Sequence, residues 1–487
     1  MHTTVIPRFV PCLIVVFALL GTVIGAKAVG QSMPDLPSSE PYSLSYAAGG
    51  RDNQGNFLGG TELMNLVGFE GKLYAGVGYW MDRPRLFPAH AGAPGDSQMD
   101  RSHFDPAHVD PKSGAQILVL DSKHSQWRQE HVFSQRDADG KFKYSRLSSM
   151  QVIRFHRFDA AGNVLGTSVE MLMISLDGGD GAVYTQKSPG HWEDTRIPTA
   201  TPIRSLAVHY DPTDGTEKVF AGTGGGEDRD LDRAIYSGVY DPSAPGRIRW
   251  NPTPERFKLN SRVMSMVDYN GTLFAAAKPS ILRRNDAKKS WEVIYSYPIN
   301  DPYEQSKYVS GFRGLTCING PDGKKALLSG FEGVSGDILR VDPQTGAAVV
   351  ELNTRQFLTQ IWKTPPARKD IIAGYNDIPV VKSSRGEVRL FGLLAASPNP
   401  REKNAAWFLS RTPGNPPGYE LHKIRAPLNW PYARSDGALW SVRTIAVSPF
   451  PDDQGQILYM GGYDGHFKPD HNTAWLCRVG VDTALAP

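Results

Sequence analysis

The stretch Arg262–Ala277 reads RVMSMVDYNGTLFAAA, and two hundred residues earlier Glu62–Val77 reads ELMNLVGFEGKLYAGV. The two align without a gap, with apolar residues at the same steps, an aromatic residue eighth and Gly tenth. Leu, an aromatic residue and Ala follow at steps twelve to fourteen in both. Alternating apolar residues on both sides of a Gly-containing turn are typical of a two-stranded β-hairpin. The chain therefore contains the same predicted hairpin at least twice.

The hairpin pattern recurs along the chain. Three more copies begin at Arg204, Arg313 and Arg443, a longer copy begins at Arg146, and a divergent copy begins at Asp377. Together these give seven repeat units, numbered 1 to 7 in chain order, which start near residues 62, 146, 204, 262, 313, 377 and 443. The recurrence of one hairpin pattern at these seven positions predicts a repeat architecture.

The second halves of the units also resemble one another. In several units a short strand and a polar turn precede an aromatic residue that opens another strand, namely Trp127, Trp192, Trp291 and Tyr419. Each unit is therefore predicted to be a four-stranded antiparallel meander. A single sheet of this kind cannot bury both faces, so the units must stack around an axis. We predict an all-β fold, a seven-bladed β-propeller with one blade per unit.

The two ends of the repeat region complement each other. Unit 7 has only three predicted strands, the last in NTAWLCRVGV at residues 472–481, whereas PYSLSYA at residues 41–47 precedes unit 1 as an unassigned strand. We expect this N-terminal strand to complete the last blade. Such pairing would close the ring and remove an exposed sheet edge.

The first residues have the features of a targeting segment. Arg8 precedes the apolar run Phe9–Ile24, and Ala26-Lys27-Ala28 provides small residues on both sides of the expected cleavage position. We predict a signal peptide at 1–28, cleaved after Ala28, a flexible leader at 29–40 and a single domain at 41–487. The protein is then secreted or periplasmic, without an integral membrane span in the mature chain; an uncleaved anchor is the alternative.

Charge and cysteine content limit the partners. The chain has 53 Lys and Arg against 50 Asp and Glu, and cleavage would remove only the basic Arg8 and Lys27 from this count. Such a balance argues against a nucleic-acid partner bound through general electrostatics. Cys317 and Cys477 would remain after cleavage, either paired or as two buried thiols. We expect a monomer.

The repeat pattern resembles the broad kelch and Asp-box groups of β-propeller proteins over residues 41–487, and this resemblance implies the propeller architecture. The chain departs from both groups in detail. None of its Trp-containing turns has the Gly of the Asp-box form Ser-x-Asp-x-Gly-x-x-Trp, and no double glycine of the kelch type recurs in register. The resemblance therefore implies no particular activity.

Five arginines open first strands and are candidate ligand-binding residues. In a propeller of meanders the starts of the first strands lie on the same face as the second-to-third loops, which are the long ones here, and binding sites tend to form from long loops. A guanidinium binds planar anions through paired hydrogen bonds. The predicted site consists of Arg146, Arg204, Arg262, Arg313 and Arg443, flanked by Trp80 and Trp440. Alternatively, each arginine pairs with a carbonyl or an acid of the next blade and only holds the ring together.

Histidine and aspartate gather in the long loops of units 1 and 7, which would be neighbours in a closed ring. Together they suit a transition metal. The candidate ligands are His90, His103, His108, Asp464, His466 and His471, and a solvated polar lid is the alternative. No cofactor is otherwise evident.

From these observations we predict an exported β-propeller that binds an anionic or carbohydrate-like ligand, a small molecule or a glycan, at its long-loop face. One alternative is an extracytoplasmic hydrolase or lyase, metal-dependent or not, that uses the His and Asp residues of the loops in units 1 and 7. Another is a protein-interaction scaffold. Fold alone does not decide among these functions.

Overall fold

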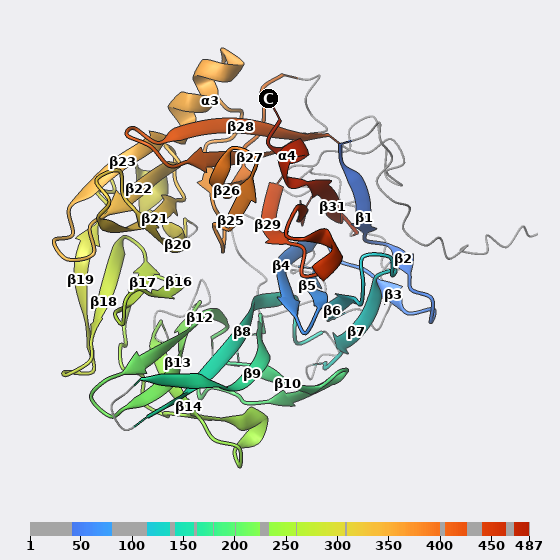
Figure 1. Ribbon diagram of the computed structural model, residues 1–487, viewed down its shortest axis with the longest axis vertical. Helices are drawn as coiled ribbons and strands as arrows, with labels where there is room; N and C mark the ends of the chain where they lie inside the picture. The colour runs from blue at the N-terminus through green and yellow to red at the C-terminus, as the bar shows by residue number, and fades with distance from the viewer. Residues whose placement is uncertain are drawn as a thin grey trace, which may run out of the picture. The chain divides into compact units, whose positions relative to one another are not determined.

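The computed structural model describes residues 41–79, 114–136, 142–159, 163–178, 180–199, 201–224, 233–259, 261–306, 309–399, 405–425, 441–463 and 472–486. All of them belong to one compact part of the chain, Ser32–Pro487. The described residues form antiparallel strands with only short helices between them (Figure 1). The predicted all-β class is therefore confirmed.

Five four-stranded antiparallel sheets each take their strands from one repeat unit, in chain order. Units 1 to 3 form β4 (Glu62–Phe69), β5 (Lys72–Gly78), β6 (Ala115–Leu120), β7 (Arg128–Phe133); β8 (Leu147–Phe158), β9 (Val164–Leu176), β10 (Val183–Ser188), β11 (His191–Asp194); and β12 (Ile203–Asp211), β13 (Thr216–Thr223), β14 (Ile235–Tyr240), β15 (Ile248–Trp250). Units 4 and 5 form β16 (Val263–Asp268), β17 (Leu273–Ala277), β18 (Ser280–Asn285), β19 (Ser290–Ser296); and β20 (Phe312–Asn319), β21 (Lys325–Phe331), β22 (Asp337–Val341), β23 (Ala348–Asn353). The predicted meander is present in each of these five units.

Units 6 and 7 share one nine-stranded sheet. Its strands are β24 (Ile372–Ala373), β25 (Val380–Ser383), β26 (Gly386–Leu394), β27 (Ala405–Thr412), β28 (Gly418–Arg425), β29 (Ser441–Val447), β30 (Ile457–Tyr463), β31 (Ala474–Gly480) and β1 (Ser43–Ala47). The two units join where Leu394 of β26 pairs with Ser441 of β29. The first strand of unit 6 is interrupted, since β24 and β25 both pair with β26. Asp377 lies in this interruption and does not open a strand, contrary to the prediction.

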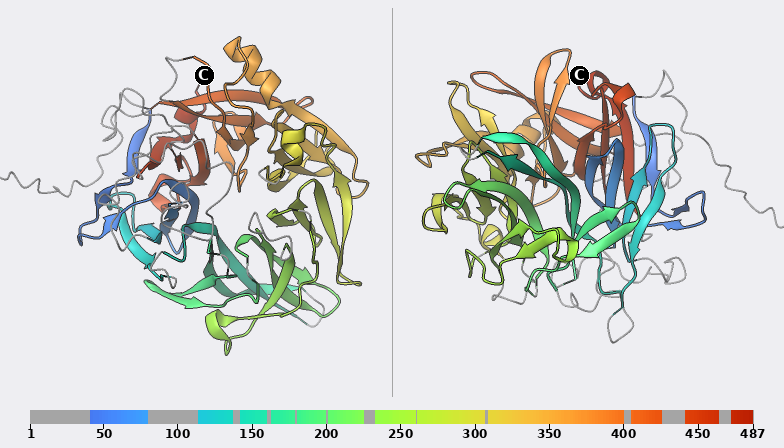
Figure 2. Two further views of the ribbon diagram at one scale, coloured as in Figure 1. Left: turned by 180° about the vertical axis from the view of Figure 1, so that it is seen from behind. Right: turned by 60° about the horizontal axis from the view of Figure 1, so that its bottom comes forward.

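The strand that precedes unit 1 in the sequence lies in the sheet of unit 7. β1 is antiparallel to β31, with Ser43 opposite Arg478 and Ala47 opposite Trp475. Figure 1 and both views of Figure 2 show the blue β1 beside the dark red β31. Trp127, directly before β7, donates its Nε1–H to Ser45 Oγ at 3.0 Å. This bond ties β1 to the sheet of unit 1 as well.

The remaining elements are short. They are β2 (Gly50–Arg51), β3 (Phe57–Leu58), η6 (Pro245–Arg247), α2 (Pro302–Gln305), α3 (Thr354–Trp362), η8 (Pro451–Asp453) and α4 (Val481–Ala484). Among these short elements α3 is the longest helix, and it begins where the Asn353 side chain accepts a hydrogen bond from the Gln356 N–H, as an N-cap residue does. Across the residues that the structure describes, no helix has the length and apolar character needed to cross a membrane.

The hydrophobic core lies between successive sheets. Leu172 and Ile174 of β9 pack with Tyr74 of β5, and Phe220 of β13 packs with Ala275 of β17. All five side chains are almost completely buried. Burial of an aliphatic or aromatic side chain contributes roughly 1.5–3 kcal/mol, so the interfaces between sheets are a main source of stability.

A β-bulge recurs near the start of the first strand. In unit 1, Leu63 pairs with Val77 and Asn65 with Gly76, so Met64 is an extra residue without a partner. The extra residues at the matching place in units 2, 3, 4 and 7 are Ser148, Arg204, Met264 and Arg443. The sequence alignment placed all the arginines at one position, and this is wrong. Arg146 and Arg262 precede the bulged residue by two positions, as Glu62 does, whereas Arg204 and Arg443 are themselves the bulged residues.

Candidate functional site

The predicted arginines lie at one end of the first hairpins. Antiparallel pairing puts the start of each first strand beside the end of the second, as Glu62 lies opposite Gly78 in unit 1. The strands β5, β13 and β30, which precede the long links of units 1, 3 and 7 in the sequence, end here. A bulge also changes the direction in which side chains leave a strand. We call the charged and tyrosine side chains at this end, described next, the arginine network.

One branch of the network connects units 7, 1, 2 and 3. Arg443 Nη1 lies 3.0 Å from Glu62 Oε1, and Arg146 Nη1 donates to Glu62 Oε2 at 2.6 Å. Arg146 Nε also donates to Asp177 Oδ2 at 3.0 Å, and Arg204 Nη2 approaches the same oxygen at 3.3 Å. Glu62 and Asp177 have no exposed surface. Buried carboxylates require such partners because an uncompensated buried charge is very costly.

These contacts also keep Arg146 charged. Burial alone lowers the pKa of the Arg146 guanidinium, but Glu62 and Asp177 outweigh that effect and raise the pKa above its ordinary value. Arg146 therefore serves as a permanent cation between two buried acids.

A second branch lies in units 4 and 5. Arg313 Nε donates to Glu332 Oε2 at 2.6 Å, and its Nη2 donates to Ser310 Oγ at 3.1 Å. Arg262 Nη1 reaches the same serine hydroxyl at 3.4 Å. Lys278, which follows β17, donates to the carbonyl oxygens of Ser306 and Val309. Glu332 and Glu304 both act on Lys278 and favour its charged form, although burial lowers its pKa overall.

Tyr375 connects the two branches. The guanidinium carbon of Arg443 lies 4.5 Å from the centre of the Tyr375 ring and that of Arg313 lies 5.4 Å from it, both within the range of cation–π contacts. The Tyr375 hydroxyl lies 2.7 Å from Ser441 Oγ and 3.4 Å from the Tyr463 hydroxyl. Burial raises the pKa of Tyr375 well above its ordinary value, so the hydroxyl stays neutral.

The interruption of unit 6 brings Tyr375 to this place. Gly374 has a φ of 73°, a left-handed conformation that glycine adopts without strain, and Pro379 has no N–H for a sheet hydrogen bond. Between them, Asn376 Nδ2 donates to the Met64 carbonyl oxygen of β4 at 3.2 Å. Asp377 remains solvent-accessible, although the surrounding protein partly desolvates its carboxyl and raises its pKa.

The structure brings the five predicted arginines into this network. It also adds residues that the sequence reasoning missed, chiefly Asp177, Glu332, Tyr375 and Tyr463. The signal for the two acids was in the sequence: each follows the last residue of a second strand, the position that antiparallel pairing places beside the arginine. Trp80, Trp440 and all six candidate metal ligands lie outside the described residues. Within the described ranges, no group of three or more His, Cys, Asp or Glu side chains could hold a metal ion.

The two cysteines of the predicted mature chain are not bonded to each other. Cys477 is buried in β31, and Cys317 is half-buried in β20. Burial raises the pKa of each thiol to about 12. Both are therefore protonated at neutral pH and unsuited to act as nucleophiles.

Comparison with known proteins identifies no family for this chain. No protein-family model matches it, and no curated protein matches it. A solved structure with similarity is the extracellular domain of the putative hybrid two component system BT4673 from B. thetaiotaomicron, at 11% identity and a TM-score of 0.45, covering 90% of this chain and 39% of that chain. The extracellular domain of the putative one component system BT4673 from B. thetaiotaomicron gives 10% identity, a TM-score of 0.45 and coverages of 90% and 40%.

A third solved structure, BBS1N in complex with ARL6DN, is similar at 10% identity and a TM-score of 0.33, covering 65% of this chain and 74% of that chain. The chain spans about two fifths of the length of the first two structures.

Proposed function

We propose that the seven units form a seven-bladed β-propeller that β1 closes as the outer strand of the last blade. Contacts between neighbouring units support this arrangement. From unit 7 through unit 1 to unit 5, each first strand touches the next, in the order β29, β4, β8, β12, β16, β20. Units 5 and 6 touch through β21 and β24, and units 6 and 7 touch through β26 and β29. The proposal includes a signal peptide at 1–28, a leader at 29–40 and one domain at 41–487, and hence export; we also propose that the protein is a monomer.

The function proposed for this fold is binding of an anionic, carbohydrate-like ligand at the end of the hairpins where the arginine network lies. The described network contains the five arginines and Lys278 beside the carboxylates Glu62, Asp177 and Glu332, and a site rich in cations suits an anionic ligand. Trp80 and Trp440 stay predicted as flanking aromatic residues, and the histidines and Asp464 of the long loops stay predicted as metal ligands.

The observation that carries the proposal is a pair of unsatisfied donors beside Tyr375. Arg313 Nη1 and Arg443 Nε are buried, and neither has a hydrogen-bond acceptor within the part of the chain described here. A buried donor without an acceptor costs roughly 1–3 kcal/mol. A carboxylate or sulfate oxygen from a ligand would satisfy these donors, and the Tyr375 ring between the two guanidiniums would define the side from which it binds.

A conservative double variant tests the proposal. Arg313→Lys with Arg443→Lys keeps both charges beside Glu332 and Glu62 but removes the planar guanidinium fork. We expect at least a tenfold loss of affinity for polygalacturonate by isothermal titration calorimetry, and no binding of neutral dextran by either protein. The control is Arg249→Lys, which changes an exposed ion pair with Asp241. Unchanged affinity in a folded double variant would contradict the proposal.

A further inference from the structure

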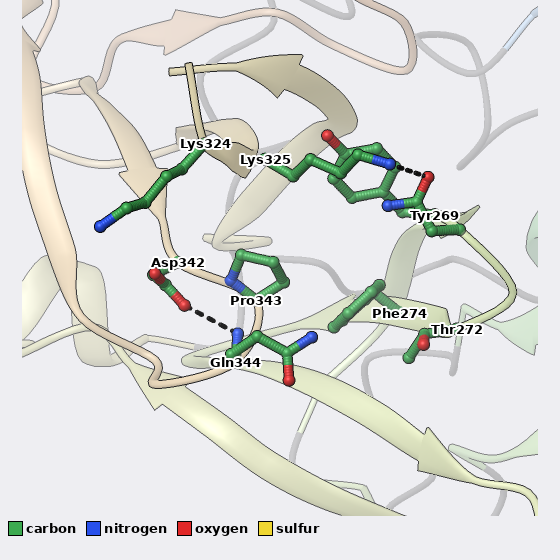
Figure 3. Close-up of a pocket in the computed structure, with 9 residues that line it drawn as sticks. Tyr269, Thr272, Phe274, Lys324, Lys325, Asp342, Pro343 and Gln344 are labelled. Atoms are coloured by element: carbon green, nitrogen blue, oxygen red, sulfur yellow. Dashed lines mark hydrogen bonds between the residues drawn. The ribbon is translucent and has the colours of Figure 1, made fainter. Parts of the chain in front are cut away.

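A cavity of about 310 Å³ lies between units 4 and 5, at the opposite end of the hairpins from the arginine network. Three short turns surround it: the turn from β16 to β17, the turn from β20 to β21 and the turn from β22 to β23. Figure 3 shows the lining side chains. The proposed ligand site involves none of these turns, so the cavity is a separate feature.

The floor of the cavity is apolar and held in place. It consists of Tyr269, Phe274 and Pro343. The Tyr269 hydroxyl donates to the Ile318 carbonyl oxygen at 3.0 Å, and Arg283 Nη1 of unit 4 donates to the Pro343 carbonyl oxygen at 3.3 Å. Phe274 is almost completely buried. The floor therefore keeps its shape without a ligand.

The walls of the cavity are polar, and their net charge is positive. Lys325 Nζ donates to Asn270 Oδ1 at 2.5 Å and lies 5.5 Å from the centre of the Tyr269 ring. Lys324 lies on the side of Asp342, as Figure 3 shows. Asp342 is a turn residue, since its Oδ1 accepts hydrogen bonds from the Gln344 and Thr345 N–H groups at 2.8 and 2.9 Å. The two ammonium groups point to opposite sides in Figure 3: Lys325 Nζ lies at Asn270, whereas Lys324 lies on the Asp342 side and its Nζ is 3.8 Å from Asp322 Oδ2.

Two neutral wall groups can hydrogen-bond to a guest. For the Thr272 hydroxyl and the Gln344 side-chain amide, the described residues provide no hydrogen-bond partner, and the Gln344 side chain points toward Phe274 in Figure 3. An amide offers both a donor and an acceptor, and a hydroxyl does the same. Vicinal hydroxyl groups of a sugar match such a pair.

We propose that this cavity binds one uronic-acid residue, a pyranose ring that carries a carboxylate. Its volume is at the lower end of the range for small-ligand sites, which suits a single ring. The half-buried Tyr269 ring would pack against the C–H face of the sugar, in the way that aromatic side chains bury apolar surface while polar groups bond at the edge. Thr272 and Gln344 bind ring hydroxyls, and Lys325, whose ammonium lies on the Asn270 side of the cavity, binds the carboxylate.

Saturation-transfer difference NMR with D-glucuronate and with D-glucose tests this site. We expect transfer to the glucuronate ring protons in the wild type and at least a threefold weaker signal in Lys324→Gln with Lys325→Gln. The matched control is Lys288→Gln with Lys289→Gln. These two lysines are also exposed and adjacent, but they lie in a turn of unit 4, and their replacement should leave the signal unchanged. Acetate, which has the carboxylate alone, should give no transfer.

Several results would overturn the proposal. They are equal signals from glucose and glucuronate, a signal from acetate, a loss in the control pair, or no glucuronate signal in the wild type. The same comparison is made in the Arg313→Lys and Arg443→Lys background, where the proposed ligand site is impaired. The glucuronate signal that remains there, and that Lys324→Gln with Lys325→Gln then reduces, comes from this cavity alone. This comparison distinguishes a failure of the cavity proposal from a failure of the proposed function.

Discussion

Arg443 and Glu62 form an ion pair, with Nη1 and Oε1 3.0 Å apart, that connects the last repeat unit to the first. Glu62 is completely buried and accepts a second bond from Arg146 of unit 2. One carboxylate therefore holds three units together at the end of the hairpins where the proposed ligand binds.

Glu62→Gln should lower the free energy of unfolding by about 3 kcal/mol, because removing one member of a buried ion pair leaves the other charge uncompensated. Urea denaturation measures this. Glu170→Gln is the control, because Glu170 forms an exposed pair with Arg154 and such pairs contribute about 1 kcal/mol or less. Equal losses in the two variants would show that the Glu62 pairs do not hold the units together.

Tyr46→Ala should destabilise the pairing of β1 with β31. Tyr46 is 5% exposed, and its hydroxyl donates to the Gly59 carbonyl oxygen. Its ring lies edge to face with that of Trp127, with the ring centres 6.3 Å apart. Loss of a buried aromatic side chain costs about 3–5 kcal/mol. We expect faster hydrogen exchange in β1 and in β31, measured by mass spectrometry. Phe257→Ala, at an exposed position, should leave that exchange unchanged, and protection retained in Tyr46→Ala would contradict the prediction.

His209 should make the stability of the contact between units 3 and 4 depend on pH. Its side chain is completely buried, with Nδ1 2.6 Å from Asp268 Oδ2 and Nε2 3.0 Å from Asp286 Oδ1. Burial alone lowers the pKa of His209, but hydrogen bonds to Asp268 and Asp286 outweigh that effect and raise it. Arg284 also faces this group, because its Nη1 donates to Asp286 Oδ1.

The direction of this pH dependence follows from the linkage between protonation and folding. The pKa of His209 in the folded state is above the unfolded value of about 6.5. The stabilisation that protonated His209 gives the folded state is therefore complete below pH 6.5, and it is lost as the pH rises through the folded pKa. The difference in urea midpoint between wild type and His209→Gln should therefore shrink between pH 6 and pH 9. A difference that stays constant over this range would show that His209 does not titrate.

Cys317 and Cys477 should react with Ellman's reagent only when the protein unfolds. Burial raises the pKa of each thiol to about 12, and the thiolate is the reactive form. At pH 8 we expect at least a hundredfold faster labelling in 6 M guanidinium chloride than in buffer, followed by absorbance at 412 nm. Fast labelling of the native protein would show that the sheets around β20 and β31 open readily.

Much of the fold could be predicted because each unit carries its own pattern. The alternation in Glu62–Val77 and in Arg262–Ala277 depends on local sequence, and the hairpins β4–β5 and β16–β17 form there. The leftover strand at residues 41–47 could be assigned to unit 7 by counting strands. These features need only the two-residue period of a strand and the glycine of a turn.

Other features depend on contacts that no local pattern encodes. The alternation in DIPVV at residue 377 suggested a strand, but Asn376 bonds to β4 of a distant unit and the strand starts only at Val380. Likewise, Arg204 and Arg443 were aligned with Arg146 by residue type, although the bulge shifts them by two positions. Asp177 and Glu332 could have been found from their place after a second strand, but Glu62 is 84 residues from Arg146 and far more from Arg443, and only the folded chain identifies it as their shared partner.

The antiparallel register of β1 against β31 also determines how the molecule responds to mechanical load. Ser43, at the start of β1, lies opposite Arg478, near the end of β31, so tension applied through the two ends of the chain would reach the same end of the pair. The backbone bonds would then break one after another, as in a zipper, and not all together in shear. A pull at Ser43 and Arg478 should thus peel β1 away at low force before any other strand detaches.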